Sequence, residues 1–179
     1  ARGVRNSVGF DFHPTSKKLY FTDNGRDWLG DDSPSCELNR VDEEGAFYGF
    51  PYKHANSIPD PEFGKLNPGY DFINPIEELG AHVAPTGIAF YKGAMFPQFN
   101  NNLFITLHGS WNRSSKVGYK VIRVILGKNG EVIEKKDFIT GWLKKGEVSG
   151  RPSSAFVMRD GSLLISDDKA NVIYRVTQS

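Results

Sequence analysis

Cysteine, net charge and long apolar runs are all scarce in this sequence of 179 residues. The single cysteine, Cys36, excludes an intramolecular disulfide framework and any metal site built from several cysteines. Lys and Arg number 22 against 21 Asp and Glu, a formal net charge of +1 that argues against a dedicated nucleic-acid or anionic-membrane surface. The longest apolar stretches, such as residues 121–126, are too short to span a bilayer.

A sustained helical period is also missing. Short runs rich in Val, Ile, Phe and Tyr recur instead between Gly, Pro, Asn and Asp, a pattern typical of an all-β chain. Asn129-Gly130 and Asp160-Gly161 predict tight turns. The predicted strands are residues 8–12, 18–22, 38–41, 87–91, 102–107, 119–126, 136–140, 154–158, 162–166 and 172–176.

A weak internal repeat orders these strands into three copies that begin near Val8, Thr86 and Ser153. Each copy has three strands, and each third strand ends in Arg-Val, which is typical of propeller blades; an all-β sandwich is the alternative. A loop-rich insertion at about residues 51–79 separates the first two copies. Because about four to eight blades are needed to close a ring, residues 1–179 are expected to form the C-terminal half of a larger propeller. The start at Ala1, without an initiator Met or a signal core, fits a mature, trimmed or partial chain.

Six strings that periodicity does not explain follow one another along the chain. Together they resemble the soluble glucose/sorbosone (aldose sugar) dehydrogenases that use pyrroloquinoline quinone (PQQ), in particular the sorbosone-dehydrogenase-like branch. The strings are RNSVG at 5–9, TDNGRDWLGDD at 22–32 with ELN at 37–39, FYGFP at 47–51, HVAPTG at 82–87, HGSWNR at 108–113 and GRPS at 150–153.

The resemblance implies a six-bladed quinoprotein β-propeller, represented here by about three blades. It also implies a PQQ- and calcium-dependent enzyme that oxidises an aldose-type sugar at its anomeric carbon, in the periplasm or outside the cell. This segment alone is expected to be inactive, since it carries only part of the sites. The sugar and the electron acceptor are not indicated.

The resemblance assigns cofactor contacts to Arg5, Asn6, His82, Lys116 and Arg151. Guanidinium and ammonium groups suit the three carboxylates of PQQ. We expect Arg5 and Arg151 to face one common cavity, because they begin equivalent inner strands of different repeats. The sequence departs from the family pattern at four positions. Val8 and Ser153 replace a polar and a basic residue, His82 stands where the family has Thr, and Arg26 stands where the glucose enzymes have Pro.

The resemblance also implies calcium, which takes hard oxygen ligands, often backbone carbonyls. The carbonyls of Gly25 and Arg26 match a calcium that also holds the quinone. The Glu37 carboxylate and the Tyr48 carbonyl match a second, structural calcium. No His-rich or Cys-rich spacing indicates zinc.

The catalytic residue stays unknown, because the base of the family is a His that lies upstream of Arg5. None of the four His matches it; His13 and His54 are expected at the surface, and His108 in a loop that lines the propeller mouth. Two further expectations are that Trp111 packs against a neighbouring blade, with stacking on a sugar face as the alternative, and that the acidic loop formed by Asp27, Asp31 and Asp32 is solvated.

Two other functions stay open. One is a non-catalytic propeller segment that binds a carbohydrate or a protein partner, and the other is a calcium-dependent lactonase-type propeller, since propellers host many functions. For each of these functions, a missing N-terminal half or a second copy is expected to complete the ring.

Overall fold

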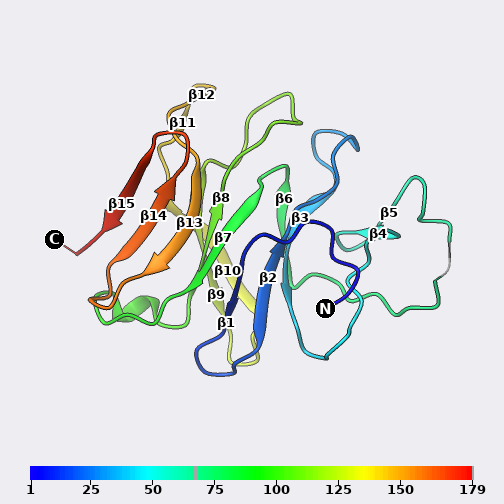
Figure 1. Cartoon of the computed structure of the whole chain (residues 1–179), viewed down its shortest axis with the longest axis horizontal. Helices are drawn as coiled ribbons and strands as arrows, with labels where there is room; N and C mark the ends of the chain where they lie inside the picture. Colours follow the sequence, from blue (N-terminus) through cyan, green and yellow to red (C-terminus); the bar gives the residue numbers. More distant parts are fainter. Residues whose placement is uncertain (67, 179) are drawn as a thin grey trace.

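A computed structural model describes residues 1–66 and 68–178, and most of its strands belong to three antiparallel sheets that stand side by side (Figure 1). We call these sheets blades 1, 2 and 3. Each begins with the predicted strand order, in which successive strands along the chain pair with one another. Within the described residues no helix has the length and apolar character needed to cross a membrane.

Blade 1 has the order β1-β2-β3-β6. The sequence predicted its first three strands but not β6, because Glu-Glu-Leu-Gly-Ala contains no β-branched or aromatic residue. Pairing with β3 makes this segment a strand. Its strands are β1 (Phe10–Phe12), β2 (Leu19–Asp23), β3 (Ser35–Arg40) and β6 (Glu77–Ala81), and the connection from β3 to β6 carries a hairpin of β4 (Lys53–His54) and β5 (Ile58–Pro59).

Blade 2 has four strands, and blade 3 has three. The turns at Asn129-Gly130 and Asp160-Gly161 connect successive strands as predicted, with both glycines at positive φ. The strands of blade 2 are β7 (Pro85–Phe90), β8 (Leu103–Leu107), β9 (Lys120–Leu126) and β10 (Val132–Ile139), with the 3-10 turn η1 (Pro97–Phe99) after β7. A hairpin of β11 (Leu143–Lys144) and β12 (Glu147–Val148) leads to blade 3, which consists of β13 (Pro152–Val157), β14 (Leu163–Asp167) and β15 (Val172–Val176).

The hydrophobic core lies in two layers, one on each side of blade 2. Alternate residues along its strands face opposite sides, so Ile88 and Ile105 pack toward blade 1 whereas Ala89 and Phe104 pack toward blade 3. The central strand β8 is buried along its whole length for this reason. Cys36 belongs to the first layer, and burial raises the pKa of its thiol, so it is an inert core residue.

The first strands of the blades, β1, β7 and β13, lie against one another along an inner edge. Two glycines permit this approach: a Cβ on Gly9 would lie 2.7 Å from the Thr86 carbonyl oxygen, and a Cβ on Gly87 would lie 2.6 Å from Ser154 Cα. The Thr86 hydroxyl donates to the carbonyl oxygen of Ser153 at 2.8 Å, across the boundary between blades 2 and 3. This stacking of sheets around a shared inner edge is the arrangement of a β-propeller.

The two outer flanks carry exposed apolar side chains. Phe10 and Phe12 of blade 1 are 66% and 53% exposed, and Phe156 and Ile173 of blade 3 are 62% and 67% exposed. The equivalent faces of blade 2 are covered by blades 1 and 3. The apolar side chains of blades 1 and 3 that face away from blade 2 therefore stay exposed.

Candidate functional site

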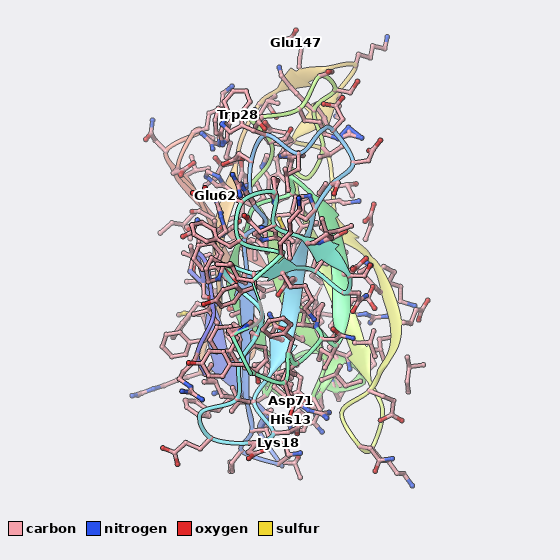
Figure 2. The ribbon with its side chains drawn as sticks, turned by 90° about the vertical axis from the view of Figure 1, so that its right-hand side faces the viewer. His13, Lys18, Trp28, Glu62, Asp71 and Glu147 are labelled. Atoms are coloured by element: carbon pink, nitrogen blue, oxygen red, sulfur yellow. The ribbon has the colours of Figure 1, made fainter. Side chains whose placement is uncertain are left out.

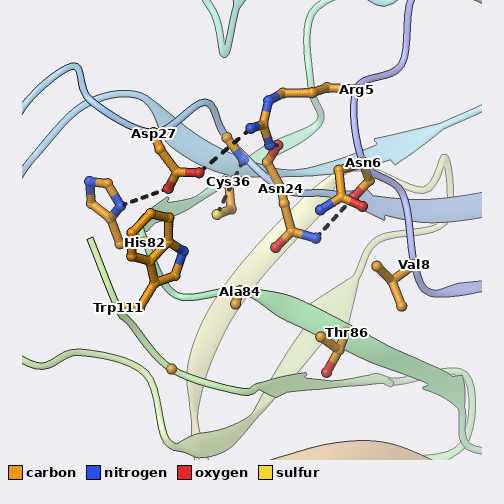
Figure 3. A pocket seen from close by; sticks show the side chains of 12 residues that line it. Arg5, Asn6, Val8, Asn24, Asp27, Cys36, His82, Ala84, Thr86 and Trp111 are labelled. Carbon is orange, nitrogen blue, oxygen red and sulfur yellow. Dashed lines mark hydrogen bonds and ion pairs between the residues drawn. The ribbon is translucent and has the colours of Figure 1, made fainter. Parts of the chain in front are cut away.

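Two adjoining hollows lie where the inner strands begin and the second strands end, and Trp111 lines both. This is the end of the molecule at which Figure 2 places Trp28 and Glu147, opposite His13 and Lys18. The first hollow, drawn in Figure 3, lies between blades 1 and 2 and the second between blades 2 and 3. The lining residues of the first include Arg5, Asn6, Val8, Asn24, Gly25, Asp27, His82 and Thr86, and those of the second include Lys116, Tyr119, Arg151, Asp168 and Lys169.

The Arg5-Asn6 pair is held by the carboxylate that ends β2. Asp23 accepts the backbone N–H of Arg5 at 2.8 Å and that of Asn6 at 2.6 Å. The Asn24 carbonyl oxygen accepts the Arg5 guanidinium at 3.1 Å, and the Asn24 amide donates to the Asn6 carbonyl oxygen at 2.9 Å (Figure 3). Burial raises the pKa of Asp23 despite these donors, which means that burial destabilises its ionised form. Asp23 and Asn24 therefore hold Arg5 and Asn6 in place at the first hollow.

Asp27 stands between the two predicted cofactor contacts Arg5 and His82 (Figure 3). Its carboxylate lies 3.7 Å from the Arg5 guanidinium and 3.9 Å from Nδ1 of His82. The other His82 ring nitrogen, Nε2, hydrogen bonds with the Gly30 carbonyl oxygen at 2.8 Å, and the side chain is 4% exposed. Asp27 is thus part of the hollow, and the expectation of a merely solvated acidic loop is wrong for this residue.

Gly25 lies at the first hollow, whereas the side chain of Arg26 turns away from it to Asp60. A Cβ on Gly25 would lie 2.9 Å and 3.1 Å from the carbonyl oxygens of Pro34 and Ser35, so only glycine fits here. The Gly25 turn is therefore packed tightly against the backbone of Pro34 and Ser35.

Asp60 ties the insertion to the candidate site. Its carboxylate forms an ion pair with Arg26 and lies 2.8 Å from Nε2 of His54. Burial opposes ionisation, but the N–H groups of Phe63 and Glu62 together with His54 and Arg26 hold the pKa of Asp60 well below its usual range. His54 is 4% exposed, so its predicted surface position is wrong: it is a buried partner of Asp60.

Glu37 and Tyr48 lie in the interior of blade 1 and its insertion. The Glu37 carboxylate accepts the Ala55 N–H and the Asn39 side-chain amide, both at 2.8 Å. Burial raises the pKa of Glu37, and the buried Asn39 Oδ1 beside it has no hydrogen-bond partner among the described residues. An unpaired amide oxygen next to a buried carboxylate is a donor set that suits a hard cation. The Tyr48 hydroxyl donates to the Arg40 carbonyl oxygen at 2.8 Å. The atom of Tyr48 that could bind such a cation is therefore its backbone carbonyl oxygen.

The second hollow is flanked by Lys116 and Arg151. The Lys116 ammonium donates to the Gly146 carbonyl oxygen at 2.9 Å, in the turn between β11 and β12. The Arg151 guanidinium lies 2.9 Å from Nδ1 of His108, whose Nε2 lies 2.8 Å from the Asp168 carboxylate. Both nitrogens of His108 are therefore engaged.

The structure brings the five predicted cofactor residues to one end of the propeller but divides them between the hollows. Arg5, Asn6 and His82 line the first hollow. Lys116 and Arg151 line or flank the second, so the expectation of one cavity shared by Arg5 and Arg151 is replaced by two that meet at Trp111. The guanidinium and ammonium groups at the two hollows could hold an anion that carries several carboxylates. No group of three or more His, Cys, Asp or Glu side chains suited to a metal occurs in residues 1–66 and 68–178.

Three residues of the site were missed. Asp23 and Asp167 hold the loops of Arg5 and Arg151, and their signal was the Asp that ends the second strand in two repeats, LYFTD and LLISD. Trp28 lies beside Trp111, with ring centroids 5.6 Å apart. Trp111 is 70% exposed, so its expected packing against a neighbouring blade is wrong.

Comparison with known proteins identifies relatives. Residues 69–179 match the family model described as TrAA12-like. An uncharacterized protein of Borreliella burgdorferi is 48% identical over 180 residues, which cover 98% of this chain and 48% of that protein. The chain therefore spans about half the length of the relatives it matches.

Solved structures share the fold. A calcium structure of a Trichoderma reesei carbohydrate-active enzyme of family AA12 has a TM-score of 0.79 at 23% identity, over 99% of this chain and 53% of that one. The holo PQQ domain of a Coprinopsis cinerea pyranose dehydrogenase has a TM-score of 0.71 at 19% identity, with 98% and 54% covered. The apo aldose sugar dehydrogenase of Escherichia coli has a TM-score of 0.67 at 21% identity, with 98% and 46% covered. The predicted fold class is confirmed: the chain is all-β and forms about three antiparallel propeller blades, with the fold of these structures.

Proposed function

Because the chain belongs to the TrAA12-like family, we propose that it is part of a PQQ- and calcium-dependent dehydrogenase that oxidises an aldose-type sugar at its anomeric carbon. The observation that carries the proposal is the gathering of Arg5, Lys116 and Arg151 around Trp111 at one end of the inner strands. Relatives of the same fold include a PQQ domain and an aldose sugar dehydrogenase, which supports the same reading. The sorbosone-dehydrogenase-like branch, the C-terminal position in a longer chain and a periplasmic or secreted location belong to the proposal.

In this proposal the chain binds and orients the cofactor. When bound, the quinone supplies the acceptor for the hydride that leaves the sugar. Arg5 and Arg151 would hold its carboxylates, with Asn6, His82 and Lys116 as further contacts. Asp23 and Asp167 keep the two arginine loops in place through backbone N–H groups. His108 is not proposed as the base, since Arg151 and Asp168 contact both of its ring nitrogens.

Calcium is proposed at the carbonyls of Gly25 and Arg26, and a second calcium at Glu37 and the Tyr48 carbonyl. The position of Gly25 at the first hollow supports the first site, and the unpaired Asn39 Oδ1 beside Glu37 supports the second. All proposed ligand atoms are oxygens, as calcium prefers.

The exposed flanks support the proposal that further blades complete the ring, from the rest of a longer chain or from a second copy. The equivalent positions Leu38 and Val121 in blades 1 and 2 are 0% exposed, whereas Ile173 in blade 3 is 67% exposed. In the natural protein we expect Ile173 to be covered. Protection of Ile173 from radical footprinting supports this, and full reactivity contradicts it.

The test is a titration of the natural full-length protein with PQQ in the presence of calcium, followed by dye reduction with a panel of aldoses. Arg5→Ala and Arg151→Ala should each weaken PQQ binding about tenfold, since a charge-assisted hydrogen bond contributes about 1.5–3 kcal/mol. Arg159→Ala is the matched control, because Arg159 is exposed in the turn between β13 and β14. Wild-type protein that fails to bind PQQ, or variants that bind like the control, overturn the proposal.

A further inference from the structure

Two of the three tryptophans stand exposed as a pair at the candidate site. Trp28 is 76% exposed and Trp111 is 70% exposed, whereas Trp142 is buried in the second core layer. The rings of Trp28 and Trp111 meet edge to face, with centroids 5.6 Å apart and an interplanar angle of 81°. Trp111 lines both hollows, so the pair extends outward from them.

The loops that carry the two rings are fastened to each other. The Trp28 N–H donates to the Asn112 side-chain oxygen at 2.9 Å, and the Ser114 N–H donates to the Asp31 carboxylate at 3.0 Å. The Arg113 guanidinium lies 2.6 Å from the Asp32 carboxylate. One loop follows β2 and the other follows β8, so the contacts join blades 1 and 2 above the first hollow.

Trp28 also has a backbone conformation that bulky residues rarely adopt, with φ at 68°. Such a conformation costs free energy and persists only where surrounding contacts enforce it, commonly at binding sites. Here the enforced conformation presents an indole to solvent instead of burying it. Neither ring belongs to the two core layers.

From this geometry we propose that Trp28 and Trp111 form a carbohydrate-binding platform, which holds sugar units of an oligosaccharide beyond the unit that reacts. This inference rests on the proposed function, because the sugar unit that reacts is the substrate of the proposed dehydrogenase. The C–H groups on the face of a pyranose ring carry partial positive charge and suit the negative face of an indole. Asp31 and Asp32 contact the other loop through Oδ1, and each has a second carboxylate oxygen to accept a sugar hydroxyl.

The surroundings of the pair favour a sugar over a protein or a lipid surface. Polar and charged side chains flank the two indoles, and the large exposed apolar residues on the blade flanks belong to other elements. Surfaces that bind proteins or membranes usually present a wider continuous apolar patch. Isolated aromatic rings with a few placed polar groups are typical of small polar ligands.

The test is calorimetric titration of the natural full-length protein, without cofactor, with cellohexaose, maltohexaose and glucose. Wild type should bind at least one hexasaccharide more tightly than glucose. Trp28→Ala and Trp111→Ala should each weaken hexasaccharide binding about tenfold and leave glucose binding within about twofold. Tyr70→Ala is the control, because Tyr70 is an exposed aromatic of the insertion.

Two variants separate the rings from the loop contacts. Trp28→Ala keeps the backbone N–H that donates to Asn112, so the loops stay fastened. Asn112→Ala keeps both rings but removes that acceptor, and it should weaken hexasaccharide binding by about threefold. If Trp28→Ala or Trp111→Ala fails to fold, Trp28→Phe and Trp111→Phe, which keep an aromatic face, should give an intermediate loss.

Wild type that binds neither hexasaccharide, or tryptophan variants that bind like Tyr70→Ala, overturn the platform. The proposed function fails separately: absence of PQQ binding with tryptophan-dependent hexasaccharide binding leaves the platform in place. Conversely, sugar-dependent dye reduction in which both tryptophan variants keep the wild-type KM for hexasaccharides overturns the platform and leaves the dehydrogenase.

Discussion

Blades 1 and 3 place an aspartate at the same point, the last residue of the second strand, and the two carboxylates behave in opposite ways. Asp23 and Asp167 are both nearly inaccessible, at 6% and 3% exposed. Burial raises the pKa of Asp23, and the N–H groups of Arg5 and Asn6 do not offset it. In Asp167 burial is outweighed by backbone N–H donors, so its pKa is lowered. An equivalent position in a repeat therefore does not give an equivalent electrostatic role.

Desolvation and donors both contribute to the difference: desolvation prevails at Asp23, although the N–H groups of Arg5 and Asn6 and the Ser7 side chain donate to it. Asp167 accepts backbone N–H groups from Arg151, Lys169 and Ala170 at 2.8–3.1 Å, and the Tyr174 hydroxyl at 3.3 Å. Two of these donors follow it in the turn to β15. Blade 3 thus uses its aspartate to order a turn, whereas blade 1 keeps a carboxylate close to the candidate calcium carbonyls at Gly25.

The largest expected effect tests the inner edge, where blade 1 has Gly9 and blade 3 has Ser154 at the same position. Gly9→Ser should destabilise the protein by about 2–3 kcal/mol, because its Cβ would lie 2.7 Å from the Thr86 carbonyl oxygen of blade 2. Urea unfolding followed by circular dichroism measures this. The reverse change, Ser154→Gly, should cost less than about 1 kcal/mol, since Ser154 is exposed. Equal effects of the two changes would contradict the stacking of the inner strands.

The next effect tests the role of Asp167 as an acceptor. Asp167→Asn should cost about 2 kcal/mol in free energy of unfolding at pH 7, because an amide oxygen replaces a charged acceptor of three N–H groups. Asp168→Asn, whose side chain is 55% exposed, is the neighbouring control and should change stability by less than about 0.5 kcal/mol.

The pH dependence of this difference is a third expectation. Because the folded pKa of Asp167 lies below its ordinary value of 3.8, its stabilisation is present above pH 3.8 and is lost as the pH falls through the folded pKa. The free energies of unfolding of wild type and Asp167→Asn should therefore converge below pH 3.8. A difference that stays constant down to pH 2 would show that packing, and not ionisation, holds the turn.

Much of the fold was predictable because its signals are local. Alternating apolar residues and the Asn129-Gly130 turn are read from neighbouring positions, and the structure has the predicted strands there. The strand β6 was missed, since Glu77–Ala81 becomes a strand only through pairing with β3. Residues near one another in sequence decide the first kind of element, and partners far along the chain decide the second.

The candidate site was predictable only as a set of residue types. The resemblance assigned Arg5 and Arg151, but their division between two hollows depends on how three blades stack. The pairing of Trp28 with Trp111 joins loops that lie 83 positions apart, and no local pattern encodes it. His54 was placed at the surface, although Asp60 holds it in the interior.

The smallest expected effect sharpens the same comparison at the fourth donor of Asp167. The Tyr174 hydroxyl donates to Asp167 at 3.3 Å and accepts the Trp142 indole N–H at 3.3 Å. The equivalent residue of blade 1 is Asn39. Both contacts are long, so Tyr174→Phe should cost about 0.5–1 kcal/mol in free energy of unfolding, measured in urea at pH 7. In the double variant with Asp167→Asn the cost should shrink, because the residues share one network. Full additivity in that double-mutant cycle would mean that the hydroxyl serves Trp142 alone, and Asp167 would then have three donors, the N–H groups of Arg151, Lys169 and Ala170.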